Sequence, residues 1–94
     1  MSQHKIRTIV ECEAFENNKY SICPYADDLD EFLEGPIWAL ARNPMKGQAC
    51  DDFGLVWAIK LDGWPARRIN ECVIYYRFDD LYVELLGILD VSTL

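Results

Sequence analysis

The amino-acid sequence predicts a single α+β domain over residues 1–94, built from a mainly antiparallel sheet of four or so strands with two short helices on one face. Three observations support this fold class. Apolar and polar residues alternate in four segments, and a helical pattern separates the first segment from the other three. A length of 94 residues with 51% hydrophobic residues suits one small core and excludes a disordered tail.

The first strand is predicted over Lys5–Phe15, because most apolar residues in this segment fall on one side at period two. Asn17 and Asn18 then favour a turn, since asparagine side chains bond readily to the local backbone. Tyr20–Tyr25 is compatible with either a short strand or a loop, and Pro24 limits how far a strand there can extend inside a sheet.

Residues 26–43 show helical periodicity, with apolar residues recurring at steps of three and four and acidic residues on the opposite face. Gly35 and Pro36 interrupt this pattern, and proline suits the first turn of a helix better than its interior. The sequence therefore predicts two short helices, Asp27–Glu34 and Pro36–Arg42. A polar loop, Met45–Asp52, follows them.

Three consecutive strands are predicted in the second half of the chain, at Leu55–Leu61, Cys72–Phe78 and Leu81–Leu89, with turns between them. Their alternation places Ile59 and Leu85 in the core, facing the helices.

The last of these strands is apolar on both sides. Leu85 and Leu89 are expected on one face, and Leu86 and Ile88 on the other. A strand of this kind is typical of the centre of a sheet that is covered on both faces.

The charge balance limits the classes of partner. Nine basic residues against sixteen acidic ones give a net charge of -7 and a pI near 4.5. A free-standing nucleic-acid-binding protein usually has the opposite sign, and an acidic chain is not attracted to anionic lipid. No apolar stretch is long enough to span a membrane, and the segment Met1–Arg7 does not lead into a signal-type apolar run. We therefore expect a cytoplasmic protein.

The four cysteines, Cys12, Cys23, Cys50 and Cys72, are far apart, and His4 is the sole histidine. A zinc site usually contains a close pair of ligands on a tight turn. In a reducing compartment these thiols are expected to be small buried hydrophobes rather than disulfides or metal ligands. The sequence predicts no metal and no cofactor.

Three segments in the order Leu40–Gly47, Leu55–Leu61 and Val73–Leu86, the first containing Asn-Pro-x-x-Gly, carry a resemblance to a known family. They resemble the RelE/ParE superfamily of toxins from type II toxin–antitoxin pairs. The resemblance extends over about half the chain, Leu40–Leu89. The stretch Phe15–Tyr25 is not typical, since family members pass directly from the first strand to a helix.

The resemblance implies a toxin that is kept inactive by an antitoxin which folds on binding. RelE-like members cut messenger RNA on the ribosome without a metal, and ParE-like members act on DNA gyrase. The ribonucleases use basic residues on the sheet and a tyrosine or histidine near the C-terminus. Fixed cations stabilise the charge that develops on the phosphoryl oxygens, and a positioned acid or base transfers the proton.

Carried over residue by residue, this machinery is mostly missing. Lys60 matches a basic position late in the second sheet strand, and Arg77 matches an arginine that is often structural. The arginine that opens the family's "RVIY" sequence corresponds to Cys72 or Val73. The terminal "GHR" or "GKR" corresponds to Leu89–Val91, which supplies an aspartate in place of a cation or imidazole.

The sequence alone assigns no residue a catalytic role. His4 is the only side chain expected to titrate near neutrality without special tuning. Five residues are candidates for contact with RNA or a partner: Lys60, Trp64, Arg67, Arg68 and Arg77. The alternative for the arginines is ordinary pairing with surplus acids, which contributes only ~0–1 kcal/mol per exposed pair. The alternative for the aromatic residues is packing within the sheet.

Two function classes follow. The first is a member of the toxin family, a metal-independent ribonuclease that is weakened or inactive. The second is a non-enzymatic interaction domain on the same scaffold. In both cases we expect an antitoxin-like or other protein partner, or a homodimer, because an open sheet leaves an exposed edge.

Overall fold

The computed structural model describes residues 6–93 of the chain, so that His4 and Lys5 lie outside the described residues. The helices and strands follow in the order β1 (Thr8–Glu11), α1 (Glu13–Ile22), α2 (Ala26–Arg42), β2 (Gln48–Ala49), β3 (Trp57–Leu61), β4 (Cys72–Phe78) and β5 (Tyr82–Asp90). Three short 3-10 helices, η1 (Pro44–Lys46), η2 (Pro65–Arg67) and η3 (Val91–Thr93), complete the chain.

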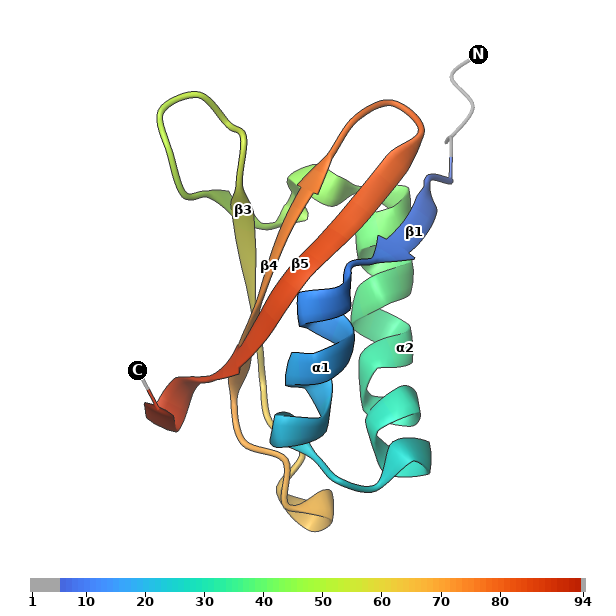
Figure 1. Cartoon of the computed structure of the whole chain (residues 1–94), viewed down its shortest axis with the longest axis vertical. Helices are drawn as coiled ribbons and strands as arrows, with labels where there is room; N and C mark the ends of the chain where they lie inside the picture. Colours follow the sequence, from blue (N-terminus) through green and yellow to red (C-terminus); the bar gives the residue numbers. More distant parts are fainter. Residues whose placement is uncertain (1–5, 94) are drawn as a thin grey trace.

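The strands form one five-stranded sheet in the order β1-β5-β4-β3-β2. Only the β1–β5 pair is parallel, and the other three pairs are antiparallel. Both helices lie together on one side of the sheet (Figure 1). The predicted α+β class with a mainly antiparallel sheet is therefore confirmed. No helix within residues 6–93 is long and apolar enough to cross a membrane.

The prediction of a strand over Lys5–Phe15 is wrong in its second half. The strand ends at Glu11, and α1 runs from Glu13 to Ile22, so that Asn17 and Asn18 lie inside a helix. Phe15 and Ile22, seven positions apart, are buried on one helix face. Their burial against the sheet outweighs the local turn preference of the asparagines. The chain thus passes directly from strand to helix, as in the resembled family.

The two predicted short helices are one continuous helix, α2, with Pro36 inside it. An interior proline costs about 3 kcal/mol, because it removes a backbone hydrogen bond and crowds the preceding turn. Leu29 and Leu33 are buried before Pro36, and Leu40 is buried after it. Each buried leucine contributes roughly 1.5–3 kcal/mol, so one uninterrupted apolar face outweighs the cost of the proline.

The face assignment of the last strand is corrected by a β-bulge. Tyr76 pairs with Leu85 and Tyr75 pairs with Gly87, so that Leu86 is the extra residue. The alternation changes phase there, and Ile88 is fully buried while Leu89 is 38% exposed. Leu85 is fully buried as predicted. The expectation that this strand is covered on both faces is wrong at its C-terminal end.

The strand predicted at Leu55–Leu61 begins two residues later than expected. Leu55 is exposed and sits in a tight loop, where its N–H donates to Asp51 Oδ1 at 2.8 Å and Gly54 has a φ of 66°. The segment Met45–Asp52 contains η1 and the short strand β2 in place of a simple loop. Ile59 is half-buried and packs against the core.

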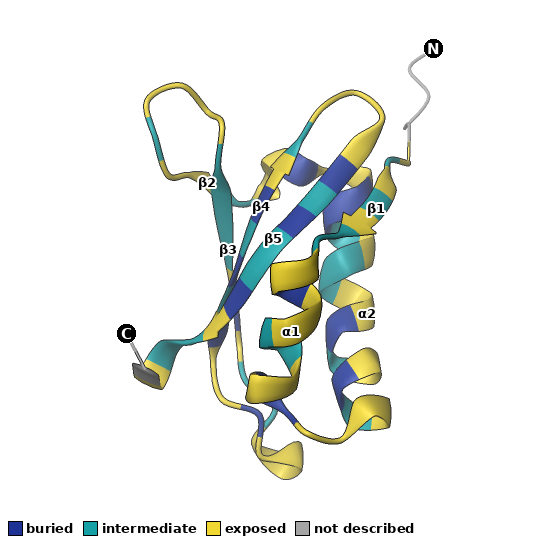
Figure 2. Ribbon diagram, in the orientation of Figure 1, coloured by how far each residue is buried: buried dark blue, intermediate teal, exposed yellow. Residues whose placement is uncertain are grey.

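The core lies between the helices and the inner face of the sheet, where α2, β4 and β5 carry most of the buried positions (Figure 2). All four cysteines are free. Cys23 and Cys72 are buried as predicted, and Cys12 is half-buried. Cys50 is exposed on the loop after β2, which corrects the prediction for that residue.

Candidate functional site

The five residues singled out from the sequence lie in two separate places. Lys60 is on β3, and Trp64, Arg67 and Arg68 lie on the β3–β4 connection near the end of β3. Arg77 lies on β4, four positions beyond Val73, the residue that faces Lys60. Four positions along a strand correspond to roughly 13 Å. The cations are therefore not gathered around one point.

Three of the cations have an anionic partner. Lys60 Nζ lies 3.1 Å from Glu71 Oε2, and Arg67 Nη1 lies 3.4 Å from Asp28 Oδ1 on α2. Arg77 pairs with Glu84 on the adjacent strand β5. The basic side chain of each pair is half or more exposed, so each pair contributes only ~0–1 kcal/mol.

Trp64 belongs to a tightly closed loop. Its N–H donates to Ile69 O at 2.7 Å and its carbonyl accepts from Ile69 N at 3.1 Å. The indole packs against the core and is covered by Arg67, whose guanidinium carbon lies 5.3 Å from the ring centroid. Arg68, which follows Arg67, has its backbone in the left-handed region, with a φ of 58°. Contact of this loop with a partner stays a prediction.

Two positions that the resemblance implies for cations, Lys60 and Val73, lie in one row with Leu89 across the outer face of the sheet. Lys60 faces Val73 in the β3–β4 register, and Val73 faces Leu89 in the β4–β5 register. Cys72, the other candidate for the family arginine, is fully buried on the inner face, so the outward position is Val73. The row thus carries one ammonium group, already paired with a carboxylate, beside two aliphatic side chains.

The aspartate that follows this row is held in its anionic form. Asp90 Oδ1 accepts hydrogen bonds from the backbone N–H and the hydroxyl of Ser92, at 2.8 and 2.6 Å, and Asp90 Oδ2 accepts from Asn70 Nδ2 at 3.1 Å. The bonds from Ser92, and then the one from Asn70, lower the pKa of the Asp90 carboxyl below its usual range. A fixed negative charge here would repel a phosphate.

The clear pKa shifts within residues 6–93 all move away from neutrality. Burial raises the pKa of the Cys72 thiol to about 11, with a smaller contribution from the nearby Asp90 charge. Burial also raises the pKa of the Tyr76 phenol, and backbone bonds from Leu81 and Tyr82 lower that of Asp79. The hydrogen bond to Glu11 raises the pKa of Lys19. None of these groups is tuned for proton transfer near pH 7.

The Asn-Pro-x-x-Gly motif has a structural role that the sequence did not reveal. The Tyr76 hydroxyl donates to Pro44 O at 2.5 Å and accepts from Gly47 N at 3.1 Å, which fastens the loop after α2 to the sheet. A Cβ at residue 47 would lie 2.3 Å from that hydroxyl oxygen and 2.5 Å from Ala58 O. The motif therefore needs glycine for close backbone approach.

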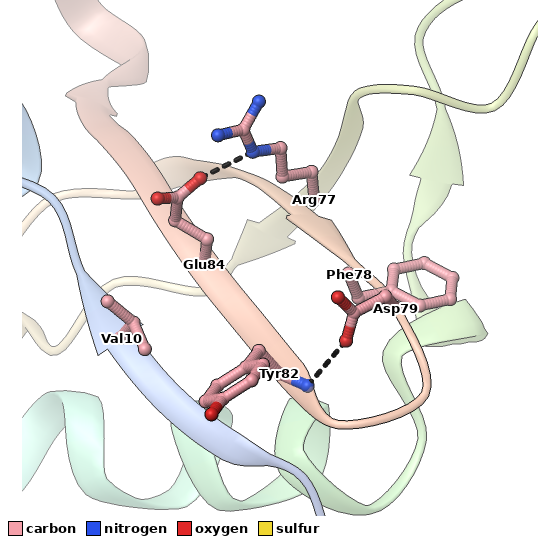
Figure 3. A pocket seen from close by; sticks show the side chains of 6 residues that line it. All are labelled: Val10, Arg77, Phe78, Asp79, Tyr82 and Glu84. Carbon is pink, nitrogen blue, oxygen red and sulfur yellow. Dashed lines mark hydrogen bonds and ion pairs between the residues drawn. The ribbon is translucent and has the colours of Figure 1, made fainter.

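A hollow of about 350 Å³ lies on the outer face near the β4–β5 turn, and Figure 3 shows the side chains around it. The Arg77–Glu84 pair crosses its floor between the two strands, and Tyr82 and Val10 line the side toward β1 (Figure 3). Asp79 Oδ1 accepts the N–H groups of Leu81 and Tyr82, both at 2.8 Å, and so fixes the turn. The arginine is held in an ion pair and the aspartate fixes the turn, so both side chains have structural roles in this hollow.

An apolar groove of about 280 Å³ lies between β1 and the C-terminal half of α2, and sequence reasoning missed it. Its lining consists of Ile6, Arg7, Ile9, Ile37, Trp38 and Ala41. Ile6 is 58% exposed and Trp38 is 49% exposed. The groove forms where two elements distant in sequence meet, and helical periodicity alone could show only that Trp38 lies near the edge of the apolar face.

No protein-family model and no curated protein matches this sequence. Among solved structures, the chain is similar to a chain in the crystal structure of the toxin–antitoxin complex RelBE2 from Mycobacterium tuberculosis, with a TM-score of 0.72. The match covers 98% of this chain and 99% of that chain at 14% sequence identity. The fold is RelE-like. This confirms the fold implied by the resemblance.

Proposed function

We propose that this RelE-like chain is the toxin-fold component of a cytoplasmic toxin–antitoxin pair, that it binds an antitoxin-like protein, and that it has little or no ribonuclease activity. One observation carries the proposal of weak catalysis: of the positions matched to the family's cations, Lys60 is already paired, and Val73 and Asp90 carry no positive charge. The likeness to a toxin–antitoxin complex supports the proposal of a protein partner.

The magnitudes favour a large loss of rate. Removing one charge-stabilising donor typically costs about 10²–10³ in rate, and losing a positioned acid or base costs about 10²–10⁴. Both groups are lacking at the aligned positions within residues 6–93. A net charge of -7 further slows the approach to RNA, because electrostatic steering requires opposite charge.

The β1 edge and the groove beside it are the surface that best suits the partner. Thr8 N–H donates to Leu81 O, just before β5, and Cys12 N–H donates to Leu85 O on β5. Because alternate residues of a strand point the same way, the backbone N–H and C=O of Ile9 and Glu11 face the free edge. The helix end closes only the start of that edge, where Arg7 N–H donates to Ala41 O at 2.9 Å. An extended partner segment can pair with Ile9 and Glu11 there and place apolar side chains against Trp38.

Cleavage is tested with purified chain and ribosomes stalled on a defined messenger. We expect no cut above background for the native chain and no change for Lys60→Ala or Arg77→Ala. The double variant Val73→Arg/Asp90→Lys, which restores cations at two matched positions, tests whether those positions limit activity. A codon-specific cut by the native chain that Lys60→Ala abolishes would contradict the proposal.

Partner binding is tested by affinity purification of the tagged chain from its native host, with Trp38→Glu as the groove variant and Tyr25→Glu as an exposed control away from the groove. We expect a small co-purifying protein that Trp38→Glu loses and Tyr25→Glu retains. Growth of cells that express the chain alone tests for toxicity: normal growth is expected from the proposal, and impaired growth relieved by that protein would show an active toxin. Sedimentation decides whether the isolated chain is a homodimer.

A further inference from the structure

The C-terminal half of β3 is a second open edge of the sheet. The partner strand β2 pairs only with Trp57 and Ala58, and β3 continues to Leu61 without it. Cys50 N–H donates to Val56 O at 2.8 Å, which shows that the backbone groups of Val56 point toward the β2 side. Because alternate residues of a strand point the same way, the N–H and C=O of Lys60 face this open edge.

A groove of about 320 Å³ lies directly beside this edge. The middle of α2 forms one wall with Phe32, Gly35, Pro36 and Ala39, and Ile59 and Leu61 of β3 form the other. A second hollow of about 400 Å³ continues along the edge, and both hollows are lined by Lys46, Ile59 and Lys60. The edge therefore combines free backbone groups with an apolar channel on the inner side.

The helix residues in this groove are unfavourable for the helix itself. Gly35 and Pro36 both lower helix stability, and a Cβ at residue 35 would have nothing within 4 Å. Gly35 relieves the crowding that a Cβ would cause before the Pro36 ring, but core packing does not require either residue. Their common effect is to keep the helix slim where it borders the groove.

The charges around the edge select one kind of strand. The Lys60 side chain lies on the outer face of β3, and Lys46 lines both hollows where they meet. Lysines on an edge oppose pairing with a second copy, since like charges would face each other across the new strand pair. Lys60 is paired with Glu71 at 3.1 Å, but this contact is exposed and weak, and Lys46 has no such partner within residues 6–93, so the two ammonium groups favour a segment that carries carboxylates. Asp62 limits that preference to the part of the edge before Leu61.

We propose that the β3 edge from Ile59 to Leu61 binds an extended segment of a partner protein in which apolar and acidic residues alternate. The segment adds one strand to the sheet through the backbone of Lys60. Its inward side chains enter the groove against Gly35, and its outward carboxylates contact Lys60 and Lys46. This surface is separate from the β1 edge, so the inference does not depend on the proposed antitoxin site.

The test uses a library of random twelve-residue peptides displayed on phage and selected on the full chain. Selected peptides are titrated against the native chain, Lys60→Glu, and two helix variants matched in stability, Gly35→Ala/Pro36→Ala and Gly35→Met/Pro36→Ala. We expect alternating acidic and apolar peptides that bind the alanine pair as well as the native chain. Binding should weaken about tenfold or more for Lys60→Glu and for the variant with methionine in the groove.

Hydrogen exchange locates the bound peptide independently of affinity. The amide of Lys60 should exchange rapidly in the free chain and be protected at least about tenfold with saturating peptide, because the added strand accepts its N–H. Thermal melts check that both helix variants are folded. Peptides that bind the methionine variant as tightly as the alanine variant, or that leave the Lys60 amide unprotected, would overturn the inference.

Discussion

The two faces of the sheet differ in how closely they follow the resembled family, although the same strands build both. On the inner face, Ile74, Tyr76 and Leu85 are fully buried under the helices. Val73 on the outer face and Asp90 at the end of β5 stand where the resembled family has cations. The difference shows that the sequence features shared with that family lie largely at packing positions.

The Asn-Pro-x-x-Gly motif belongs with the inner face in this comparison. The motif looks like a functional signature in the sequence, yet its contacts are the bonds of Pro44 and Gly47 to the buried Tyr76 hydroxyl. A resemblance built on such positions predicts the fold well, because the fold needs them. It says little about activity, which in the resembled family uses exposed basic residues on the sheet.

The sharpest test of the difference compares two leucines of β5. Leu85→Ala should lower the free energy of unfolding by ~2–5 kcal/mol, through lost burial and a cavity in the core. Leu89→Ala, four residues along the same strand on the outer face, should cost less than about 1 kcal/mol. Urea denaturation followed by circular dichroism measures both. Equal costs would show that the bulge does not change the phase of the strand.

Alkaline pH should weaken the inner face. Burial raises the pKa of Cys72 from 9.0 to about 11 in the folded chain, so the folded state holds the thiol proton more tightly than the unfolded state does. The resulting stabilisation is complete below pH 9 and is lost as the pH rises from about 9 to 11. It amounts to about 2–3 kcal/mol.

Chemical denaturation of the native chain at pH 7, 9 and 10.5 measures this loss. Cys72→Ala should be less stable at pH 7 but should lose part of the alkaline slope. Cys50→Ala, which removes an exposed thiol, is the control and should keep the slope. A slope that is the same in all three chains would rule out Cys72 as its origin.

The Tyr76 hydroxyl should contribute measurably to the same face. Tyr76→Phe leaves the Pro44 carbonyl and the Gly47 N–H without their partner, at a cost of about 1–3 kcal/mol. Tyr82→Phe on the outer face should change stability by less than about 0.5 kcal/mol. Thermal melts of the two variants measured side by side make the comparison. A Tyr76→Phe variant as stable as the native chain would contradict the structural role of the motif.

The smallest effect is expected for the ion pair on the outer face. The side chain of Arg77 is 63% exposed, so Arg77→Ala should cost only ~0–1 kcal/mol, and less at high salt. A double-mutant cycle with Glu84→Ala isolates the interaction. A coupling energy well above about 1 kcal/mol would mean that this pair holds β4 and β5 together.

Much of the second half of the chain could be predicted from the sequence. The segments 57–61 and 72–78 alternate over their whole length, and the last strand alternates as far as Leu85, before its bulge; hydrophobic period reports secondary structure directly when one face is buried. The same regularity placed Leu85 in the core. The position of Lys60 and that of the family's missing arginine were also identified by their order along the strands, with Val73 and Cys72 left as alternatives for the latter.

The first half needed the tertiary structure. By local pattern, residues 13–22 were expected to hold the end of a strand, a turn and the start of a short strand or loop, and the burial of Phe15 and Ile22 in the core decided for a helix. Similarly, Pro36 predicts a break in the helix when only local sequence is considered, but the continuous buried face of α2 outweighs that preference.

The sequence by itself determined the fold class, the acidic charge, the three consecutive strands and the shortage of cations at the family's phosphate positions, because each depends on residue type and local period. Tertiary structure decided the continuity of α2, the bulge at Leu86, the contacts of Pro44 and Gly47 with Tyr76, and the two open sheet edges. These depend on which distant segments meet, and local propensities of about 1 kcal/mol are smaller than the burial energy gained there.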